Sequence, residues 1–492
     1  MEEITISQLA QLAGATIKGD STKRICGFST DSRIGGEQIV FLPIQGEKVD
    51  GHDYIQDAYA NGIRTTFTSR KEIIPKTEEM TYLFVDDTIC AFQQAAAAYR
   101  DQFTIPVVGV TGSVGKTTTK EMIAATLSEG KCVLKTQGNK NSQIGLPQMM
   151  FEFSKKHEIA VIEMGMSLPG EMQRLVSVAK PQIAVISNIG TAHIGQLKSR
   201  EKIRLEKMSI INEFSKNGLL LLNGENDLLK EVYDAVKEGK ENGNWDVLEK
   251  IDLLKETKEK LKDCNVMTYG TTSDCDLKAV QIRQDQNKNQ TLFTFSGVFQ
   301  AKPYSEEILL HTLGIHNVQN ALAALGLALF FNIDLKQAKK GLECYQVPEM
   351  RGVIETVGRL TLIDDSYNAS SDSMKCGLDI LSGITKKRRV AILGDILELG
   401  ELAEPLHREI GTYVAKSNID QLITVGTCTA FLAKEAILQG MDKNQVIICH
   451  DQKEACDILK DVLKEEDAVF IKGSRGMYLE NVVHKIKELF SE

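Results

Sequence analysis

The sequence predicts an α/β protein with largely parallel sheets, divided into about three domains. Short β-branched runs lead repeatedly into glycine-containing turns and then into amphipathic stretches, at residues 105–110, 159–163, 183–187, 390–393, 422–425 and 468–471. Such alternation of strand and helix patterns is typical of parallel-sheet units. The chain length supports the division, because a common domain has roughly 100 to 200 residues and this chain has 492.

Two prolines mark the expected domain boundaries. Residues 1–104 carry polar, turn-rich strand patterns and end in an alanine-rich helical stretch at 91–99. Pro106 stands at the start of the second range, 105–347, and Pro348 at the start of the third, 348–492. Within the second range, a segment at 237–262 is rich in Lys and Glu and holds the only tryptophan. This composition predicts solvent-exposed surface helices.

The charge balance argues against nucleic acid and anionic membranes as partners. The chain has 58 basic and 67 acidic side chains, a net charge of −9, without a dense block of Lys and Arg. An anionic ligand must therefore be bound by a local site. The longest apolar run, at 321–331, has about eleven residues, which fits a buried helix and falls short of the ~20 residues of a membrane span.

The N-terminus and the cysteines indicate a cytoplasmic protein. Met1, Glu2 and Glu3 are not followed by the basic and apolar stretches of a signal peptide, so we expect no export. The ten cysteines form no Cys-x-x-Cys pair and no zinc-like spacing. We therefore expect reduced thiols rather than disulfides or a zinc site.

The sharpest local pattern is a glycine-rich loop between a strand pattern and a helix pattern. Glycines let backbone N–H groups approach phosphate oxygens, and a helix N-terminus favours negative charge. Lys116 supplies a cation for the β- and γ-phosphates, and Thr117 offers a hydroxyl to Mg²⁺. Because Val110 occupies the place of the first glycine, the loop has the shorter Gly-x-x-Gly-Lys-Thr form. A nucleoside triphosphate site is the resulting hypothesis, with a chance Gly-Lys-Thr as the alternative. The expected nucleotide contacts are Gly112, Ser113, Val114, Gly115, Lys116, Thr117 and Thr118.

Two polar residues follow strand patterns that would end beside this loop. Glu163 ends the apolar run 159–163 and would emerge at the same carboxyl edge of a parallel sheet. Mg²⁺ prefers carboxylate and phosphate oxygens, so we interpret Glu163 as a metal ligand rather than a surface or capping acid. His193 lies on the loop after the run 183–187. From spacing alone, its role as a ligand or as a solvated side chain stays open.

Motifs in all three ranges resemble the Mur ligase superfamily, ATP-dependent enzymes that join an amino acid or dipeptide to a nucleotide-linked peptidoglycan precursor. The resemblance rests on the phosphate loop at 111–118, on Gly-Ile-His-Asn-Val-Gln-Asn-Ala-Leu-Ala-Ala at 314–324, and on Ile-Asp-Asp-Ser-Tyr-Asn-Ala at 363–369. It implies a three-domain α/β fold with a small N-terminal domain, a central P-loop ATPase-like parallel sheet and a C-terminal Rossmann-like domain.

The resemblance also implies two Mg²⁺ ions, held by Thr117, Glu163, His193 and Lys207. Thr117 and Glu163 would bind the first ion, and His193 would help to hold the second. Lys207 matches the lysine that this family carbamylates, a change that turns a cation into a carboxylate-like anion. Its amine must first be neutral, a state that desolvation near a metal favours. Without the resemblance, a salt-bridged helix lysine would be the simpler interpretation.

Other matched residues imply contacts with the organic ligands. Arg351 would act on the γ-phosphate and stabilise charge during transfer. Asn317 would meet the adenine, Asp365 the ribose, and Asn368 would also lie on the nucleotide side. The implied catalytic residues are Lys116, Glu163, His193, Lys207 and Arg351.

The first range contains two strips that resemble those that hold a UDP-sugar. They lie at 29–33 and 46–52. Ser32 and Arg33 would contact the pyrophosphate or the uracil, and an ordinary polar turn is the alternative.

Three stretches are similar to one branch of the superfamily, the ligases that add D-alanyl-D-alanine to UDP-N-acetylmuramoyl-tripeptide. They lie at 365–374, 393–400 and 472–477, and Ser371 stands where the branch usually has proline. The implied reaction makes an acyl phosphate and ADP from the tripeptide carboxylate and ATP, and the dipeptide amine then displaces phosphate. Range 1–104 would bind the UDP precursor, 105–347 ATP, and 348–492 the dipeptide, with domain closure over ATP. We expect a monomer.

Two alternatives stay open at this point. A sibling ligase would add a single amino acid to a muramyl precursor, or glutamate to folate. A non-catalytic P-loop protein would bind ATP as a switch or scaffold, although the presence of Glu163, His193 and Lys207 together argues against it.

Overall fold

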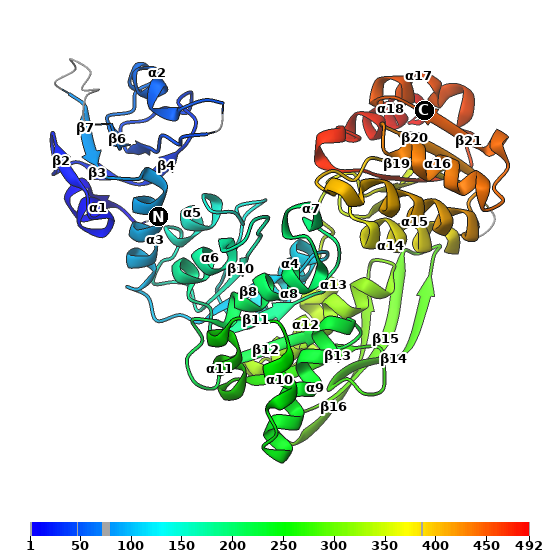
Figure 1. Cartoon of the computed structure of the whole chain (residues 1–492), viewed down its shortest axis with the longest axis horizontal. Helices are drawn as coiled ribbons and strands as arrows, with labels where there is room; N and C mark the ends of the chain where they lie inside the picture. Colours follow the sequence, from blue (N-terminus) through cyan, green and yellow to red (C-terminus); the bar gives the residue numbers. More distant parts are fainter. Residues whose placement is uncertain (1, 47, 71–78, 385–386, 492) are drawn as a thin grey trace.

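The computed structural model describes residues 2–46, 48–70, 79–384 and 387–491, and these form three α/β units (Figure 1). Each unit is built around one sheet of five, nine or six strands. In Figure 1 the N-terminal and C-terminal units stand apart, on either side above the central unit. Each outer unit contacts the central one, through the residues described below.

The N-terminal unit contains a five-stranded sheet of order β2-β7-β6-β5-β4, in which only the β2–β7 pair is antiparallel. The strands are β2 (Thr16–Lys18), β4 (Gly27–Ser29), β5 (Ile39–Phe41), β6 (Thr65–Thr68) and β7 (Thr81–Phe84), beside a separate pair, β1 (Ile4–Thr5) and β3 (Arg24–Ile25). The helices are α1 (Ile6–Ala13), α2 (Ile55–Ala60) and α3 (Thr88–Arg100). The alanine-rich stretch lies in α3, whose Phe92 ring stacks 5.6 Å from Phe151 of the central unit.

The central unit contains a nine-stranded sheet of order β16-β15-β14-β13-β12-β11-β8-β10-β9. Six strands and β14 pair in parallel, whereas β14, β15 and β16 form an antiparallel extension. The strands are β8 (Val107–Thr111), β9 (Val133–Lys135), β10 (Ile159–Glu163), β11 (Ile183–Ile186), β12 (Leu219–Asn223), β13 (Asn265–Gly270), β14 (Leu277–Asp285), β15 (Gln290–Phe299) and β16 (Lys302–Leu310). The sequence predicted the parallel part and missed the antiparallel extension.

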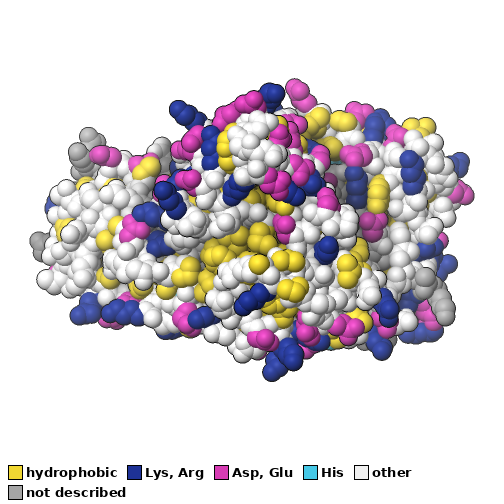
Figure 2. Space-filling view, turned by 90° about the horizontal axis from the view of Figure 1, so that it is seen from below, with side chains coloured by type: hydrophobic (Ala, Val, Ile, Leu, Met, Phe, Trp, Pro, Cys, Tyr) yellow, Lys and Arg dark blue, Asp and Glu magenta, His cyan; other side chains and the backbone are white. Residues whose placement is uncertain are grey.

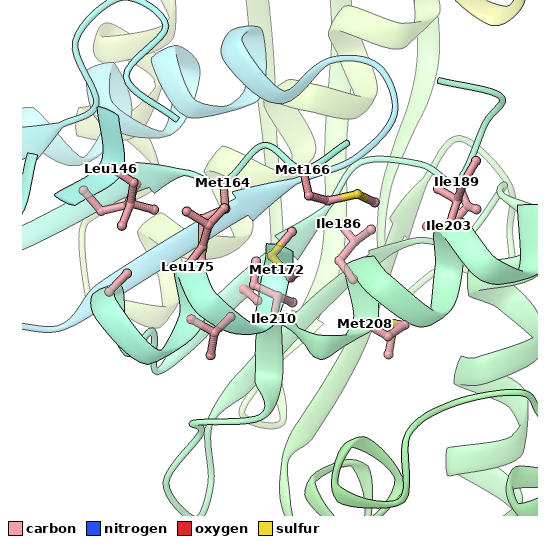
Figure 3. Close-up of a cluster of buried hydrophobic side chains, with 14 of the residues drawn as sticks. Leu146, Met164, Met166, Met172, Leu175, Ile186, Ile189, Ile203, Met208 and Ile210 are labelled. Atoms are coloured by element: carbon pink, nitrogen blue, oxygen red, sulfur yellow. The ribbon is translucent and has the colours of Figure 1, made fainter. Parts of the chain in front are cut away.

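Helices cover both faces of this sheet, because the side chains of each parallel strand alternate between two buried layers. One layer packs beneath α4 (Lys116–Ser128), α12 (Ile315–Phe330) and α13 (Leu335–Glu343). The other layer, drawn in Figure 3, joins β11 to α5 (Gly145–Met150), α6 (Glu171–Ala179) and α8 (Arg200–Met208). A short helix, α7 (Ile194–Leu197), precedes α8. As expected, the longest apolar run lies in a buried helix, α12.

The Lys- and Glu-rich segment forms helices, as expected, but it is only partly exposed. Its helices are α9 (Asp227–Asn242), α10 (Asp246–Lys250) and α11 (Lys255–Asp263). Leu248 and Leu261 are completely buried. The Trp245 ring packs on Gly239, where a Cβ atom would lie 2.3 Å from the ring. The segment is thus anchored to the central unit by apolar contacts.

The C-terminal unit contains a six-stranded sheet of order β17-β18-β22-β19-β20-β21, parallel except for the β17–β18 hairpin. Its strands are β17 (Val353–Val357), β18 (Leu360–Asp364), β19 (Arg389–Gly394), β20 (Gln421–Val425), β21 (Val446–Cys449) and β22 (Ala468–Lys472). Its helices are α14 (Ser371–Gly383), α15 (Ala403–Lys416), α16 (Thr429–Leu438), α17 (Gln452–Val462) and α18 (Glu480–Phe490). The carboxyl edge of this sheet faces the phosphate-loop side of the central unit, because Thr191 N lies 3.4 Å from Asp372 Oδ2 of α14.

The face of the molecule in Figure 2 shows no single dominant charge. On the face in Figure 2, acidic and basic side chains are interspersed around an apolar area. Within the described ranges, no helix combines the length and the apolar character needed to cross a membrane. All ten cysteines lie in the described ranges and are free thiols, as expected.

Candidate active site

The phosphate loop joins β8 to α4 and depends on two glycines. Gly115 precedes α4 with a φ of +84°, a conformation that other residues rarely adopt. At Gly112 a Cβ atom would lie 1.9 Å from Ser187 Oγ, so no side chain fits. Because α4 begins at Lys116, the N–H groups of its first turn lack intrahelical acceptors and are available to an anion.

Lys116 lies among several charges of the site. Its Nζ donates to the carbonyl of Gly112 at 2.9 Å. Burial lowers the pKa of Lys116, the carboxylate of Glu163 opposes this shift, and the charge of Arg351 adds to it. Lys116, Glu163 and Arg351, which are far apart in the sequence, therefore interact in the folded chain.

The loop after β11 holds the phosphate loop in place. The N–H groups of Ser113 and Val114 donate to the backbone and side-chain oxygens of Asn188, at 3.0 and 2.8 Å. Gly190 N in turn donates to Ser113 Oγ at 2.9 Å. Two of the predicted nucleotide contacts thus already use their backbone donors within the chain. The N–H groups of residues 115–118 are better placed for phosphate.

Glu163 ends β10 at the predicted sheet edge and is only 1% exposed. Its Oε1 accepts a hydrogen bond from Asn141 Nδ2 at 2.6 Å. Its Oε2 is buried, finds no hydrogen-bond donor among the described residues, and lies 4.0 Å from Lys120 Nζ. A buried carboxylate oxygen without a donor is costly unless a ligand compensates its charge. This orphaned oxygen fits a divalent cation.

The protein alone offers few metal donors at this edge. In the described part of the chain, no three His, Cys, Asp or Glu side chains come together closely enough to hold a metal. The predicted ligands comprise one carboxylate, one imidazole, one hydroxyl and one lysine. An Mg²⁺ ion here would therefore need further oxygens from phosphate, water or a modified lysine.

His193 precedes α7 and contacts the C-terminal unit. Its Nδ1 lies 2.8 Å from Glu398 Oε2, and Gly195 N donates to the Glu398 carbonyl at 3.2 Å. Burial lowers the pKa of His193, and the positive charges of Lys116 and Lys207 lower it further. A neutral imidazole held by a carboxylate at Nδ1 leaves Nε2 for a metal.

Lys207 lies on α8 and is 1% exposed. Burial lowers its pKa well below the usual value, and the charge of Lys116 adds to this effect. Among the described residues its amine forms no salt bridge, and only the charge of Glu206 opposes the shift, so the contacts do not support the interpretation as a salt-bridged helix lysine. The environment instead favours the neutral amine, which is the form that reacts with CO₂.

The predicted residues of the third range gather at the carboxyl edge of its sheet. The guanidinium carbon of Arg351 lies 3.9 Å from the ring centroid of Tyr367. Asp365 Oδ2 accepts from Lys472 Nζ at 2.5 Å, and the same ammonium donates to the Asn368 carbonyl at 2.9 Å. Burial raises the pKa of Asp365, while Lys472 and Arg351 oppose the shift. Asp365 and Asn368 therefore share one cation, which sequence reasoning gave no role.

Two asparagines of α12 differ in their contacts. Asn317 Nδ2 donates to the Leu313 carbonyl at 2.7 Å and to Thr312 Oγ1 at 3.2 Å, which leaves its oxygen for an adenine amine. Asn320 Oδ1 accepts from Thr119 Oγ1 of α4 at 2.9 Å. The buried Nδ2 of Asn320 has no partner among the described residues. Asn320 thus ties α12 to the phosphate-loop helix.

Ser32 and Arg33 lie far from these residues, in a pocket of about 800 Å³ in the N-terminal unit. Arg33 is 85% exposed and pairs with Asp31 at 2.7 Å, and the hydrogen bonds from Arg33 lower the pKa of Asp31 to about 2. Val49 and Tyr54, which also line the pocket, are about half exposed. The pocket thus combines a cation with apolar surface.

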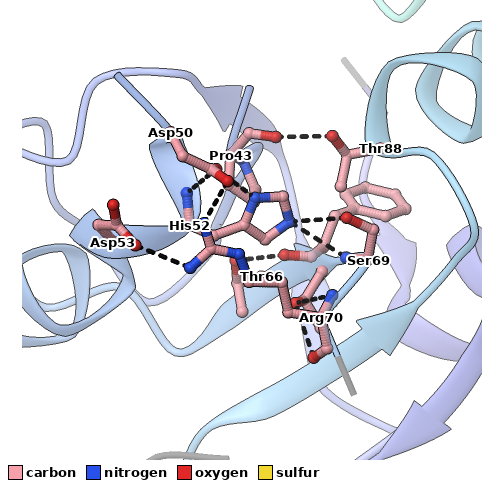
Figure 4. Close-up of polar contacts among 10 residues, drawn as sticks. Pro43, Asp50, His52, Asp53, Thr66, Ser69, Arg70 and Thr88 are labelled. Atoms are coloured by element: carbon pink, nitrogen blue, oxygen red, sulfur yellow. Dashed lines mark hydrogen bonds and ion pairs between the residues drawn. The ribbon is translucent and has the colours of Figure 1, made fainter. Parts of the chain in front are cut away.

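The second predicted strip borders this pocket and is held by a buried histidine (Figure 4). His52 Nδ1 lies 2.6 Å from Asp50 Oδ1, and its Nε2 accepts from Ser69 N at 3.1 Å. Arg70 pairs with Asp50 as well, and with Asp53 at 2.7 Å. His52 is therefore structural. Glu47 of the strip lies outside the described residues.

Sequence reasoning missed five residues that position the predicted ones. Lys472 and Glu398 lie in motifs that were noted without a role, and Lys472 directly follows the strand run 468–471. The missed residues are Asn141, Asn188, Asn320, Glu398 and Lys472. Asn320 also lies in a noted motif, 314–324, whereas Asn141 and Asn188 carried no signal except polarity in a loop after a strand.

Comparisons with known proteins point to one family over most of the chain. Family models for the Mur ligase family catalytic domain, the Mur ligase middle domain and the Mur ligase glutamate ligase domain match residues 24–111, 110–257 and 351–475. The UDP-N-acetylmuramoyl-tripeptide–D-alanyl-D-alanine ligase of Bacillus subtilis (strain 168) is 35% identical over 98% of both chains.

Solved structures share the fold. The crystal structure of MurF from Acinetobacter baumannii matches with a TM-score of 0.85 and 29% identity over 99% of both chains. MurF of Thermotoga maritima, solved in complex with ADP, matches with a TM-score of 0.75 and 23% identity over 94% of this chain and 97% of that one. The chain belongs to the Mur ligase family.

Proposed function

We propose that the chain is an ATP-dependent ligase that joins UDP-N-acetylmuramoyl-tripeptide to D-alanyl-D-alanine through an amide bond, in cytoplasmic peptidoglycan precursor synthesis. The observation that carries the proposal is the 35% identity over 98% of the chain to a ligase named for this reaction. The gathering of Lys116, Glu163 and Arg351 around the phosphate loop supports it.

ATP would bind at the central unit. Its phosphates would accept from the N–H groups of residues 115–118 and from Lys116. Asn317 would contact the adenine, and Asp365 and Asn368 would contact the ribose side. Asp365 and Asn368 belong to the C-terminal unit, so a complete nucleotide site needs both units at this edge.

Thr117, Glu163, His193 and a carbamylated Lys207 would hold Mg²⁺, which would neutralise phosphate charge. The support is the orphaned oxygen of Glu163 and the lowered pKa of Lys207. In carbamylation the neutral amine attacks the carbon of CO₂, forms an N–C bond and releases one proton. The carbamate would be negatively charged, so it would attract Lys116, whereas a protonated Lys207 would repel it.

The reaction then has two steps. An oxygen of the tripeptide carboxylate bonds to the γ-phosphorus of ATP, the bond to the β–γ bridging oxygen breaks, and ADP leaves. Lys116 and Arg351 would stabilise the charge of the transferred group. The neutral dipeptide amine next bonds to the acyl carbon and loses a proton, while the acyl–oxygen bond breaks and phosphate leaves.

We assign one ligand to each range. Residues 1–104 would bind the UDP precursor, with Ser32 and Arg33 at the pocket of about 800 Å³. Residues 105–347 would bind ATP, and 348–492 would bind the dipeptide. Because the N-terminal pocket lies far from the phosphate loop, the precursor must span the distance or the units must close.

The test is ADP release by the purified protein with ATP, Mg²⁺ and UDP-N-acetylmuramoyl-tripeptide, with and without D-alanyl-D-alanine. Release that requires the dipeptide, with product of the expected mass, supports the proposal. Release with single amino acids or glutamate instead would identify a sibling ligase. ATP binding without release under any of these conditions would favour a nucleotide switch.

A further inference from the structure

We propose that Arg475 binds the carboxylate of the incoming dipeptide; this inference rests on the proposed function. Arg475 begins a short helical turn, η5 (Arg475–Met477), directly after β22. Its side chain is 54% exposed, at the sheet edge where Lys472 meets Asp365 and Asn368. Arg475 therefore presents a solvent-accessible cation beside the proposed nucleotide site.

Arg475 lies close to the arginine assigned to the γ-phosphate. The guanidinium carbons of Arg351 and Arg475 lie 3.9 and 5.6 Å from the same Tyr367 ring centroid, so the two carbons are at most about 10 Å apart. Arg475 Nη1 also lies 3.7 Å from the sulfur of Met350, the neighbour of Arg351. A ligand held by Arg475 is thus near the place where the acyl phosphate would form.

The length of a dipeptide is of the same order as this upper bound. An extended chain spans at most ~3.6 Å per residue, so the amine and carboxylate of a dipeptide are at most ~7 Å apart. With its carboxylate at Arg475, D-alanyl-D-alanine would place its amine beside an acyl group next to Arg351. A carboxylate anchored in the N-terminal pocket would leave the amine out of reach.

The chemistry of Arg475 suits a carboxylate. A guanidinium has five N–H donors and binds carboxylates in a bidentate manner. Glu480 Oε1 lies 3.1 Å from Nη1, which orients the group and leaves the donors on Nη2 and Nε for a ligand. The nearby cation Lys472 is only 2% exposed and is already bonded to Asp365 and Asn368.

Apolar side chains beside Arg475 suit the methyl groups of alanine. Leu397 is 44% exposed and contacts Gly476, where a Cβ atom would lie 3.0 Å from Leu397 Cδ1. Tyr478, three residues after Arg475, is 58% exposed. A cation flanked by exposed apolar groups matches a small apolar peptide with a free carboxylate.

The experiment compares D-alanyl-D-alanine with its C-terminal amide in the wild type and in Arg475→Gln, by ADP release. The wild type should prefer the acid by about tenfold or more, because a hydrogen-bonded charge pair is lost with the amide. Arg475→Gln should raise the KM for the acid by about 10- to 100-fold and bring the acid and amide to similar values. The KM values for ATP and UDP-N-acetylmuramoyl-tripeptide should stay within about twofold, which also shows that the variant is folded.

Arg359→Gln is the matched control. Arg359 is 66% exposed in the β17–β18 hairpin and, like Arg475, pairs with a glutamate, with 3.3 Å between Nη1 and Glu465 Oε2. It should behave as wild type, and Arg475→Lys should retain part of the preference for the acid. A wild-type KM for the dipeptide in Arg475→Gln, or an unchanged preference for the acid over the amide, would overturn the assignment. If the wild type itself releases no ADP on addition of the dipeptide, the proposed function fails instead.

Discussion

The contact between His193 and Glu398 predicts that the variant Glu398→Ala loses metal affinity while its stability changes little. The paired side chains are 23% and 59% exposed and 2.8 Å apart, and ion pairs with such exposure contribute at most about 1 kcal/mol. We therefore expect the midpoint of thermal unfolding to fall by no more than about 4 °C. Loss of the carboxylate that orients a metal-binding histidine typically weakens metal binding by about 10- to 100-fold.

The assay is titration with Mn²⁺, as a paramagnetic substitute for Mg²⁺, in the presence of a non-hydrolysable ATP analogue. Glu404→Ala is the control, since Glu404 is 49% exposed and pairs with Arg408 at 2.8 Å within the same unit. His193→Ala should weaken Mn²⁺ binding as well, and the double variant should lose little more, because the two residues act as a pair. Wild-type Mn²⁺ affinity in Glu398→Ala would refute this reasoning.

Three further predictions concern the centre of the site. Lys207→Ala should nearly abolish ADP release, and a small carboxylate such as acetate should partly restore it; wild-type turnover without the additive would contradict carbamylation. Gly112→Ala should weaken ADP binding at least about 100-fold by calorimetry, because the new Cβ would lie 1.9 Å from Ser187 Oγ and displace the loop; unchanged affinity would show that the loop adapts. Burial, with a smaller effect of Lys472, lowers the pKa of His316 to about 4, so below pH 6.5 the unfolded chain binds a proton that the folded chain does not. The free energy of unfolding should therefore fall between pH 6.5 and 4, and less so in His316→Gln, as urea titrations at pH 7.5 and 5 would test; equal losses in both proteins would rule out His316 as a cause.

The sequence placed Lys116 and Glu163 at one edge because parallel strands that lead into helices end on the same side of a sheet. That rule works within one sheet. It does not extend to His193 and Glu398, which are 205 residues apart and meet only because two units pack against each other. The antiparallel strands β14 to β16 were missed for another reason. The side chains of β15 alternate between buried and half-buried positions, and most of those of β16 are exposed or half-buried. These strands therefore lack the continuous apolar runs that revealed the buried parallel strands.

The charges at the site favour carbamylation of Lys207. Burial lowers the pKa of both Lys116 and Lys207, and the charge of Lys116 lowers the pKa of Lys207 further. Lys207 is also the more buried of the two, so we expect its amine to be the neutral one that reacts with CO₂. Carbamylation would reverse the charge of Lys207, which would change from a group that repels a charged Lys116 into one that attracts it. The same anion would add an oxygen ligand to the predicted set of Thr117, Glu163 and His193, in which the protein alone supplies too few donors for Mg²⁺. Carbamylation should therefore come before tight binding of Mg²⁺ and ATP, and removal of CO₂ should weaken Mn²⁺–nucleotide binding in the wild type but not in Lys207→Ala.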